Sequence, residues 1–253
     1  EEILARNQTP LERVNAIGVS CGGPLNSRRG VVLCPPNLPG WHGISLTDYA
    51  QQKLHAPALL ENDANACALA EWRWGAGKGS KVMMFLTFGT GLGAGIVIGG
   101  RVLRGANGNA GELGHWRLAE TGPAGYGKVG AFEGFCSGGG IAQLAGMSAC
   151  EAVQRADAGD GAMRAALRQS AEKLGLCLAL LIDLLNPERI VIGSIYARAE
   201  RYFRQDALRV VEREALRRSS AACQILPAQL GDAIGDYAAL SVAIDGLAQK
   251  NVR

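Results

Sequence analysis

Residues 82–100 read VMMFLTFGTGLGAGIVIGG, a stretch with no charged residue and six glycines. Nineteen uncharged residues are long enough to cross a bilayer. However, Gly89-Thr90-Gly91-Leu92-Gly93 divides the stretch into two short apolar runs, 82–88 and 95–98. Because glycine favours tight turns over continuous helix, the pattern predicts a strand, a glycine-rich turn and a second strand rather than a membrane helix.

The glycine-rich turn is also a candidate phosphate site. Successive glycines expose backbone N–H groups and have no Cβ to hold phosphate oxygens away. No Gly-Lys-Ser/Thr follows, so the segment is not a Walker loop. On its own, the motif is equally compatible with a glycine-rich hairpin that binds no ligand.

On either side of this stretch, short apolar runs alternate with helical patterns. We expect strands at 16–20, 58–61 and 189–192, and helices at 46–54, 65–74, 162–185, 199–217 and 237–249, with a further helical region after Ser137. Strands that alternate with helices predict an α/β architecture. No GxGxxG opens a helix directly after the first strand, which argues against a dinucleotide-binding domain.

Composition excludes several classes of protein. The chain has 253 residues, 48% of them hydrophobic, and a formal net charge of +3. This composition is that of a globular chain with a core rather than a disordered one, and the charge is too small for a nucleic-acid or membrane-surface binder. The seven cysteines form no CxxC pair, and no signal peptide opens the chain. We therefore expect a cytoplasmic protein.

The first polar constellation is Leu60-Glu61-Asn62-Asp63-Ala64-Asn65, between a predicted strand and a predicted helix. At that position side chains point into a cleft. Asp63 could act as a general base, with Asn62 and Asn65 donating hydrogen bonds to substrate hydroxyls. Alternatively, Asp63 or Asn65 caps the following helix.

The second constellation, 107–115, reads NGNAGELGH. Glu112 and His115 are three residues apart and can converge on one polar ligand or on a metal. A single histidine is more often a structural residue, but the polar loop around it favours a ligand.

Taken in order, these loops, together with PNLPGW at 36–41 and NPERIVIG at 186–193, resemble the ROK family over residues 16–243. That family combines sugar kinases and sugar-responsive repressors. The resemblance implies a two-lobed actin/hexokinase-like (ribonuclease H-like) α/β fold. Residues 1–79 would form the remainder of the N-terminal lobe, 80–230 the C-terminal lobe, and 231–253 a helix that returns towards the N-terminal lobe.

The resemblance implies an ATP-dependent kinase that phosphorylates a hydroxyl of a hexose or N-acetylhexosamine, with Asp63 as the catalytic base. Its substrates and cofactors would be a sugar, ATP and Mg²⁺, and relatives are often homodimers. The sugar would be held by Asn37, Asn62, Glu112, His115 and Glu133. The nucleotide would be held by Gly89, Thr90, Gly91, Gly93, Gly193 and Ser194.

The sequence departs from the family pattern at the zinc motif Cys-x-Cys-Gly-x-x-Gly-Cys-x-Glu. Aligned on Glu133, its three cysteine positions hold Ala124, Tyr126 and Ala131. Alanine has no donor atom and a phenol is a poor zinc ligand, so we expect no structural zinc. We expect packing or a hydrogen bond, with Tyr126 as the candidate partner, to hold His115 instead.

A second departure concerns the Asp-x-Gly-Gly-Thr hairpin with which the family opens, because no such segment precedes Ala16. We therefore expect an incomplete N-terminal lobe, with about 40 residues missing upstream. Such a truncated chain would transfer phosphate poorly. A sugar-sensing repressor, which carries a helix-turn-helix ahead of this region, and an inactive sugar-binding fragment are the alternative functions; the chain shown contains no nucleic-acid-binding segment.

Overall fold

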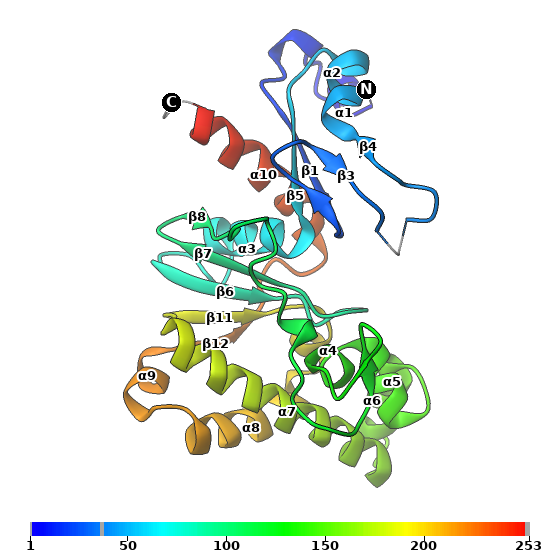
Figure 1. Cartoon of the computed structure of the whole chain (residues 1–253), viewed down its shortest axis with the longest axis vertical. Helices are drawn as coiled ribbons and strands as arrows, with labels where there is room; N and C mark the ends of the chain where they lie inside the picture. Colours follow the sequence, from blue (N-terminus) through cyan, green and yellow to red (C-terminus); the bar gives the residue numbers. More distant parts are fainter. Residues whose placement is uncertain (1, 36–37, 251–253) are drawn as a thin grey trace.

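The computed structural model describes residues 2–35 and 38–250. At its centre lies a five-stranded sheet in the order β12-β11-β6-β7-β8 (Figure 1). Strands β12, β11 and β6 are parallel, whereas β7 and β8 run antiparallel to their neighbours. The strands span β6 (Val82–Leu86), β7 (Ala94–Ile98), β8 (Arg101–Val102), β11 (Arg189–Ile192) and β12 (Gln224–Pro227).

Strands β6 and β7 confirm the predicted hairpin around the glycine-rich turn, with Val82 opposite Ile98 and Leu86 opposite Ala94. Side chains of β6 alternate between two cores, as successive residues of a strand must. Met83 and Phe85 pack with α3 on one face, whereas Met84 and Leu86 belong to the core on the other. Because both faces are covered, the strand is apolar throughout.

The second face of the sheet is covered by helices that follow β8 along the chain. Figure 1 shows α7 and α8 below the sheet, with the shorter helices at their ends. The helix predicted at 162–185 is confirmed within α7, and that at 199–217 largely coincides with α8. These elements are η2 (Leu113–His115), β9 (Ala124–Gly125), β10 (Lys128–Val129), α4 (Phe132–Phe135), α5 (Gly138–Ala145), α6 (Ala149–Asp157), α7 (Gly161–Leu185), α8 (Ser194–Glu214) and α9 (Arg217–Ala222).

The N-terminal part of the chain carries a parallel pair, β1 with β5, and a small antiparallel sheet in the order β2-β3-β4. The predicted strands at 16–20 and 58–61 and the helix at 46–54 are confirmed. The elements are α1 (Glu2–Arg6), η1 (Leu11–Arg13), β1 (Ile17–Cys21), β2 (Leu25–Asn26), β3 (Val31–Val32), β4 (Ile44–Ser45), α2 (Leu46–Leu54), β5 (Ala58–Asn62) and α3 (Asp63–Trp74).

The final helix, α10 (Ile234–Lys250), follows η3 (Gly231–Ala233) and lies against β1, β5 and α3 (Figure 1). Contact with β1 is close: a Cβ at Gly18 would collide with the backbone carbonyl of Ala239. Helix α10 therefore packs on β1, although the two elements are far apart in sequence. The boundaries expected at 79/80 and 230/231 stay a prediction.

Two features differ from the expectations. Strand β12 was not predicted, because four residues that end in proline give no alternating pattern. The helical region after Ser137 is divided into three helices. Gly146 adopts φ +70°, a left-handed conformation that ends α5, and Asp160 caps α7 by accepting from the amides of Ala162 and Met163.

Glu71 joins α3 to the segment between β12 and α10, and it is 0% exposed. Its Oε1 accepts from the amides of Gln229 and Leu230, each at 3.0 Å, and its Oε2 from Ala76 at 2.7 Å. Three backbone donors thus satisfy one buried carboxylate. Within the described ranges, no helix combines the length and apolar character that a membrane crossing requires.

Candidate functional site

The Asn62–Asp63 turn joins β5 to α3. Asn62 has extended backbone angles (φ −60°, ψ 143°), and its Oδ1 accepts from the amides of Ala64 at 3.0 Å and Asn65 at 3.3 Å. Asn62 is therefore the helix cap, and the expectation that Asp63 or Asn65 caps the helix is wrong. Asp63 is the first helical residue and exposed, and its Oδ1 accepts from Ala64 at 2.8 Å.

The turn that follows β1 lies beside Asn62 and Asp63. A Cβ at Gly22 would lie 3.8 Å from Asp63 Oδ2, and one at Gly23 would lie 3.7 Å from Asn62 Nδ2. Gly22 and Gly23 do not appear among the predicted site residues, although two glycines at the carboxyl end of a strand are a signal of close backbone approach. Parallel pairing of β1 with β5 places both strand ends at one edge.

Tyr126 stacks on His115 and lies within electrostatic range of Glu133 and Glu112. The rings of His115 and Tyr126 are stacked, with centroids 4.0 Å apart and an interplanar angle of 24°. The expectation that packing by Tyr126 holds His115 is thereby confirmed. Burial first, and then the negative charges of Glu133, Glu112 and Asp63, together raise the pKa of Tyr126 to about 12. Three of the predicted acidic residues thus lie near enough to one phenol for their charges to act on it.

Glu133 connects this acidic group to the glycine-rich turn. Its Oε2 accepts from the amide of Leu92 at 3.0 Å. A Cβ at Gly91 would lie only 2.7 Å from the same oxygen, so glycine at 91 is what allows the turn to approach the carboxylate. One side chain therefore touches the predicted phosphate turn and faces the predicted sugar residues.

The glycine-rich turn is held by two neighbouring segments. Gly89 O accepts from the amide of Gly138 at the start of α5, at 2.7 Å, and a Cβ at Gly89 would lie 3.5 Å from Ser194 Oγ. Among the described residues, the amides of Thr90 and Gly91 have no acceptor. Free amides on a braced turn are the donors that a phosphate group requires.

The remaining predicted nucleotide residues lie beside that turn. Gly193 is buried at the end of β11, and Ser194 is exposed with φ +51° at the start of α8. The amide of Gly93 donates to Thr87 Oγ1 at 2.8 Å, which fixes the far end of the turn. Asn37 lies outside the described residues.

The negative charge of Asp63 also acts on two cysteines. Burial first, and then the charges of Asp63 and Glu71, together raise the pKa of Cys67 to about 12. Burial and then Asp63 likewise raise the pKa of Cys21. Both thiols therefore remain protonated at neutral pH and are poor nucleophiles. Because both thiols are protonated at neutral pH, the carboxylate of Asp63 is the candidate base of this turn.

No three His, Cys, Asp or Glu side chains in the described part of the chain gather closely enough to hold a metal ion. Ala124 lies in β9, and Ala131 immediately precedes α4. The expectation that the chain holds no structural zinc stays a prediction.

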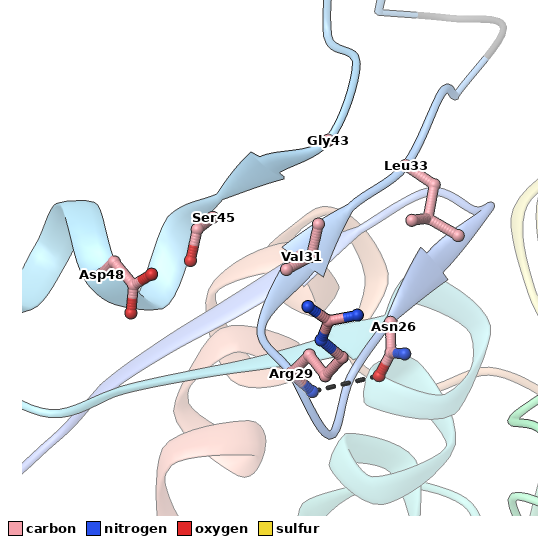
Figure 2. Close-up of a pocket in the computed structure, with 7 residues that line it drawn as sticks. All are labelled: Asn26, Arg29, Val31, Leu33, Gly43, Ser45 and Asp48. Carbon is pink, nitrogen blue, oxygen red and sulfur yellow. Dashed lines mark hydrogen bonds between the residues drawn. The ribbon is translucent and has the colours of Figure 1, made fainter.

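Two cavities are bordered by residues of the N-terminal part, and the second also by residues that follow β8. One, of about 580 Å³, lies over the β2-β3-β4 sheet and the start of α2, and Figure 2 shows Arg29, Ser45 and Asp48 around it. It contains none of the predicted site residues. The other, of about 260 Å³, borders the candidate site because Asn62 lines it together with the segments Leu25–Arg28 and 104–108.

The model of the ROK family matches residues 1–245. The chain belongs to the ROK family. As a ROK protein it adopts the actin/hexokinase-like fold, as expected from its motifs.

Three relatives illustrate the range of the family. The chain is 35% identical to a glucokinase from Halalkalibacterium halodurans over 207 residues, which cover 72% of this chain and 62% of that protein. A ROK family glucokinase from Streptomyces griseus in complex with glucose and AMPPNP has a TM-score of 0.79 at 29% identity, over 97% of this chain and 87% of that one. A ROK transcriptional regulator, a homologue of the E. coli MLC protein, has a TM-score of 0.87 at 26% identity, over 99% and 68%.

Proposed function

We propose that this ROK protein is an ATP-dependent sugar kinase that phosphorylates a hydroxyl of a hexose or N-acetylhexosamine. The observation that carries the proposal is the position of Glu133, which accepts from the amide of Leu92 in the glycine-rich turn and, with Glu112 and Asp63, acts electrostatically on Tyr126. A sugar bound near that group would face a nucleotide phosphate at the turn. Phosphoryl transfer depends mainly on such positioning.

In this proposal Asp63 is the catalytic base. Its Oδ1 accepts from the amide of Ala64, which orients the carboxylate and leaves Oδ2 for a substrate hydroxyl. Asp63 would take the proton of that hydroxyl as its oxygen attacks the γ-phosphorus and ADP leaves. Asn62 Nδ2, Glu112, His115 and Glu133 would bind the other hydroxyls, and Asn37 remains a predicted sugar contact.

The nucleotide would be bound by the glycine-rich turn and the β11–α8 junction. The free amides of Thr90 and Gly91 fit phosphate oxygens. Gly89 and Gly93 would keep the turn open, and Gly193 and Ser194 would lie near the adenosine. Mg²⁺ would enter with the nucleotide and neutralise phosphate charge.

An ADP-release assay with glucose, mannose, N-acetylglucosamine and N-acetylmannosamine tests the proposal. Asp63→Asn should lower kcat by about 10²- to 10⁴-fold, the usual contribution of a general base, and leave sugar affinity within about threefold. Asp48→Asn is the matched control, because Asp48 is an exposed carboxylate over the other cavity (Figure 2). An Asp63→Asn variant that retains a tenth of the rate would show that Asp63 is not the base.

A sugar-sensing repressor is the second candidate, because the ROK regulator superposes on this chain with a TM-score of 0.87. The ADP-release assay separates the two functions: a repressor domain binds sugar without consuming ATP. We also propose that the protein acts in the cytoplasm and that it forms a homodimer. Light scattering of the purified protein measures its oligomeric state.

A further inference from the structure

An ion cluster lies directly behind the candidate catalytic turn. Arg104 follows β8, and its Nε donates to Glu61 Oε2 at 2.8 Å while its Nη2 lies 2.7 Å from the same oxygen. The same Nη2 donates to Asp245 Oδ2 in α10 at 3.3 Å. The Glu61 and Asp245 side chains are 4% and 8% exposed, and that of Arg104 is 26% exposed. One guanidinium therefore joins three segments that are distant in sequence.

The second oxygen of Glu61 holds the turn that carries Asp63. Glu61 Oε1 accepts from the backbone amide of Asn62 at 3.0 Å and from Asn65 Nδ2 at 3.1 Å. Asn65 Oδ1 is buried without a hydrogen-bond partner among the described residues. The Asn65 amide is thus oriented towards Glu61 even though its own oxygen is left unsatisfied, which is costly in a buried site.

The cluster also closes one side of the 260 Å³ cavity next to Asn62. The hairpin segment Leu25–Arg28 forms one wall and the 104–108 segment the other. Arg104 is the residue that anchors the second wall to β5 and α10. A change at this arginine therefore affects both the turn before α3 and the spacing between two parts of the chain.

We propose that Arg104 is a positioning residue of the candidate kinase site. It neutralises Glu61, Glu61 then fixes the Asn62–Asp63 turn, and the bond to Asp245 ties the loop after β8 to α10. Arginine suits this role because its planar fork reaches two carboxylates at once, which a lysine ammonium on a single stem does less well. The kinetic part of this proposal rests on the proposed sugar kinase activity.

Loss of the guanidinium should disturb the turn more than the fold. Without Arg104, Glu61 becomes a buried charge with no compensating cation, which strongly destabilises its local setting. We expect Glu61 to turn towards water and release the amide of Asn62 and the side chain of Asn65. Asp63 would then occupy several orientations, only some of which reach a sugar hydroxyl.

The kinetic test compares three variants in the full chain. Arg104→Ala should lower kcat by about 100-fold, the scale of a misplaced reacting group, with KM for ATP unchanged within about threefold. Arg104→Lys should recover about a tenth of the wild-type kcat, because it keeps one charge beside Glu61. Arg101→Ala, at an exposed position of β8, should retain the wild-type kcat. A purely structural role would lower the melting temperature and leave kcat unchanged, which would overturn the proposal.

A second measurement needs no catalysis. Hydrogen exchange at the amides of Ala64 and Asn65, which donate to Asn62 Oδ1, should be at least about tenfold faster in Arg104→Ala than in Arg101→Ala. Unchanged exchange overturns the proposal. If the wild-type protein releases no ADP with any sugar, the proposed function fails, and the exchange result alone decides the role of Arg104.

Asp245→Asn separates the two arms of the cluster and serves if Arg104→Ala does not fold. It leaves the Arg104–Glu61 pair in place, so exchange at Ala64 should stay within about threefold of wild type. A tenfold or greater increase in Asp245→Asn would show that Glu61 does not carry the effect to the turn, and would contradict the proposal.

Discussion

Glu71 gives the most direct test of how the two parts of the chain are joined. Its carboxylate is fully buried and accepts from the amides of Ala76, Gln229 and Leu230. Glu71→Gln keeps the shape and one acceptor oxygen, so Gln229 and Leu230 retain their partner. The new NH₂ group faces the N–H of Ala76, and that one amide loses its acceptor.

The number of buried amides left without an acceptor sets the expected loss of stability. A buried N–H without an acceptor costs about 1–3 kcal/mol, so Glu71→Gln should destabilise the protein by about that amount. Glu71→Met has a similar volume but no acceptor oxygen, so all three amides lose their acceptor. The loss of stability should be about three times that of Glu71→Gln. For a chain of this size, 1 kcal/mol corresponds to about 2–4 °C in melting temperature.

Thermal unfolding followed by circular dichroism measures these shifts. Glu172→Gln is the matched control, because Glu172 is an exposed glutamate on α7, and its melting temperature should stay within about 1–2 °C of wild type. Equal melting temperatures for Glu71→Gln and Glu71→Met would refute the reasoning. The two variants would then differ in the number of amides without an acceptor but not in stability.

Three further predictions concern the site. Gly91→Ala places a Cβ 2.7 Å from Glu133 Oε2, so the turn must shift, and KM for ATP should rise about tenfold, the equivalent of roughly 1.4 kcal/mol, in steady-state ATP titrations. Burial and neighbouring carboxylates raise the pKa of Tyr126 from its usual value of 10.0 to about 12, so its contribution to stability is fully present below pH 10 and is lost as pH rises through 12. Urea unfolding at pH 9 and pH 11 should show that Tyr126→Phe loses less stability over this range than the wild type. Because the pKa of Cys67 is about 12 and Cys34 is exposed, mass spectrometry after brief iodoacetamide treatment at pH 8 should find Cys34 alkylated and Cys67 unmodified.

Much of the fold could be predicted from the sequence where local pattern and tertiary burial agree. The β6–β7 hairpin follows from two apolar runs around a glycine turn, and α7 from a long helical period. Strand β12 could not be predicted in this way. Its residues form a strand because β11 pairs with them in parallel register, from Arg189 opposite Gln224 to Ile192 opposite Pro227, and that pairing is a tertiary event.

The candidate site shows the same division. The motifs identified Asp63, Glu112, His115 and Glu133; His115 stacks on Tyr126, and the three carboxylates lie near enough for their charges to act on it. They did not identify Asn62 as the helix cap, because several capping side chains lie within one turn and only backbone angles decide among them. Arg104 and Glu71 were missed for a different reason. Each acts through partners more than 40 residues away, and a single charged residue carries no local sign of a distant partner.

The packing of α10 on β1 has a consequence for how the protein is made. Strand β1 leaves the ribosome early, but the helix that covers it is translated only after the whole central sheet. Until then β1 and β5 expose apolar surface, and the N-terminal part of the nascent chain cannot complete its packing before α10 is translated. Synthesis that pauses before residue 234 should therefore leave a chain whose central sheet has folded and whose first strand is a target for chaperones.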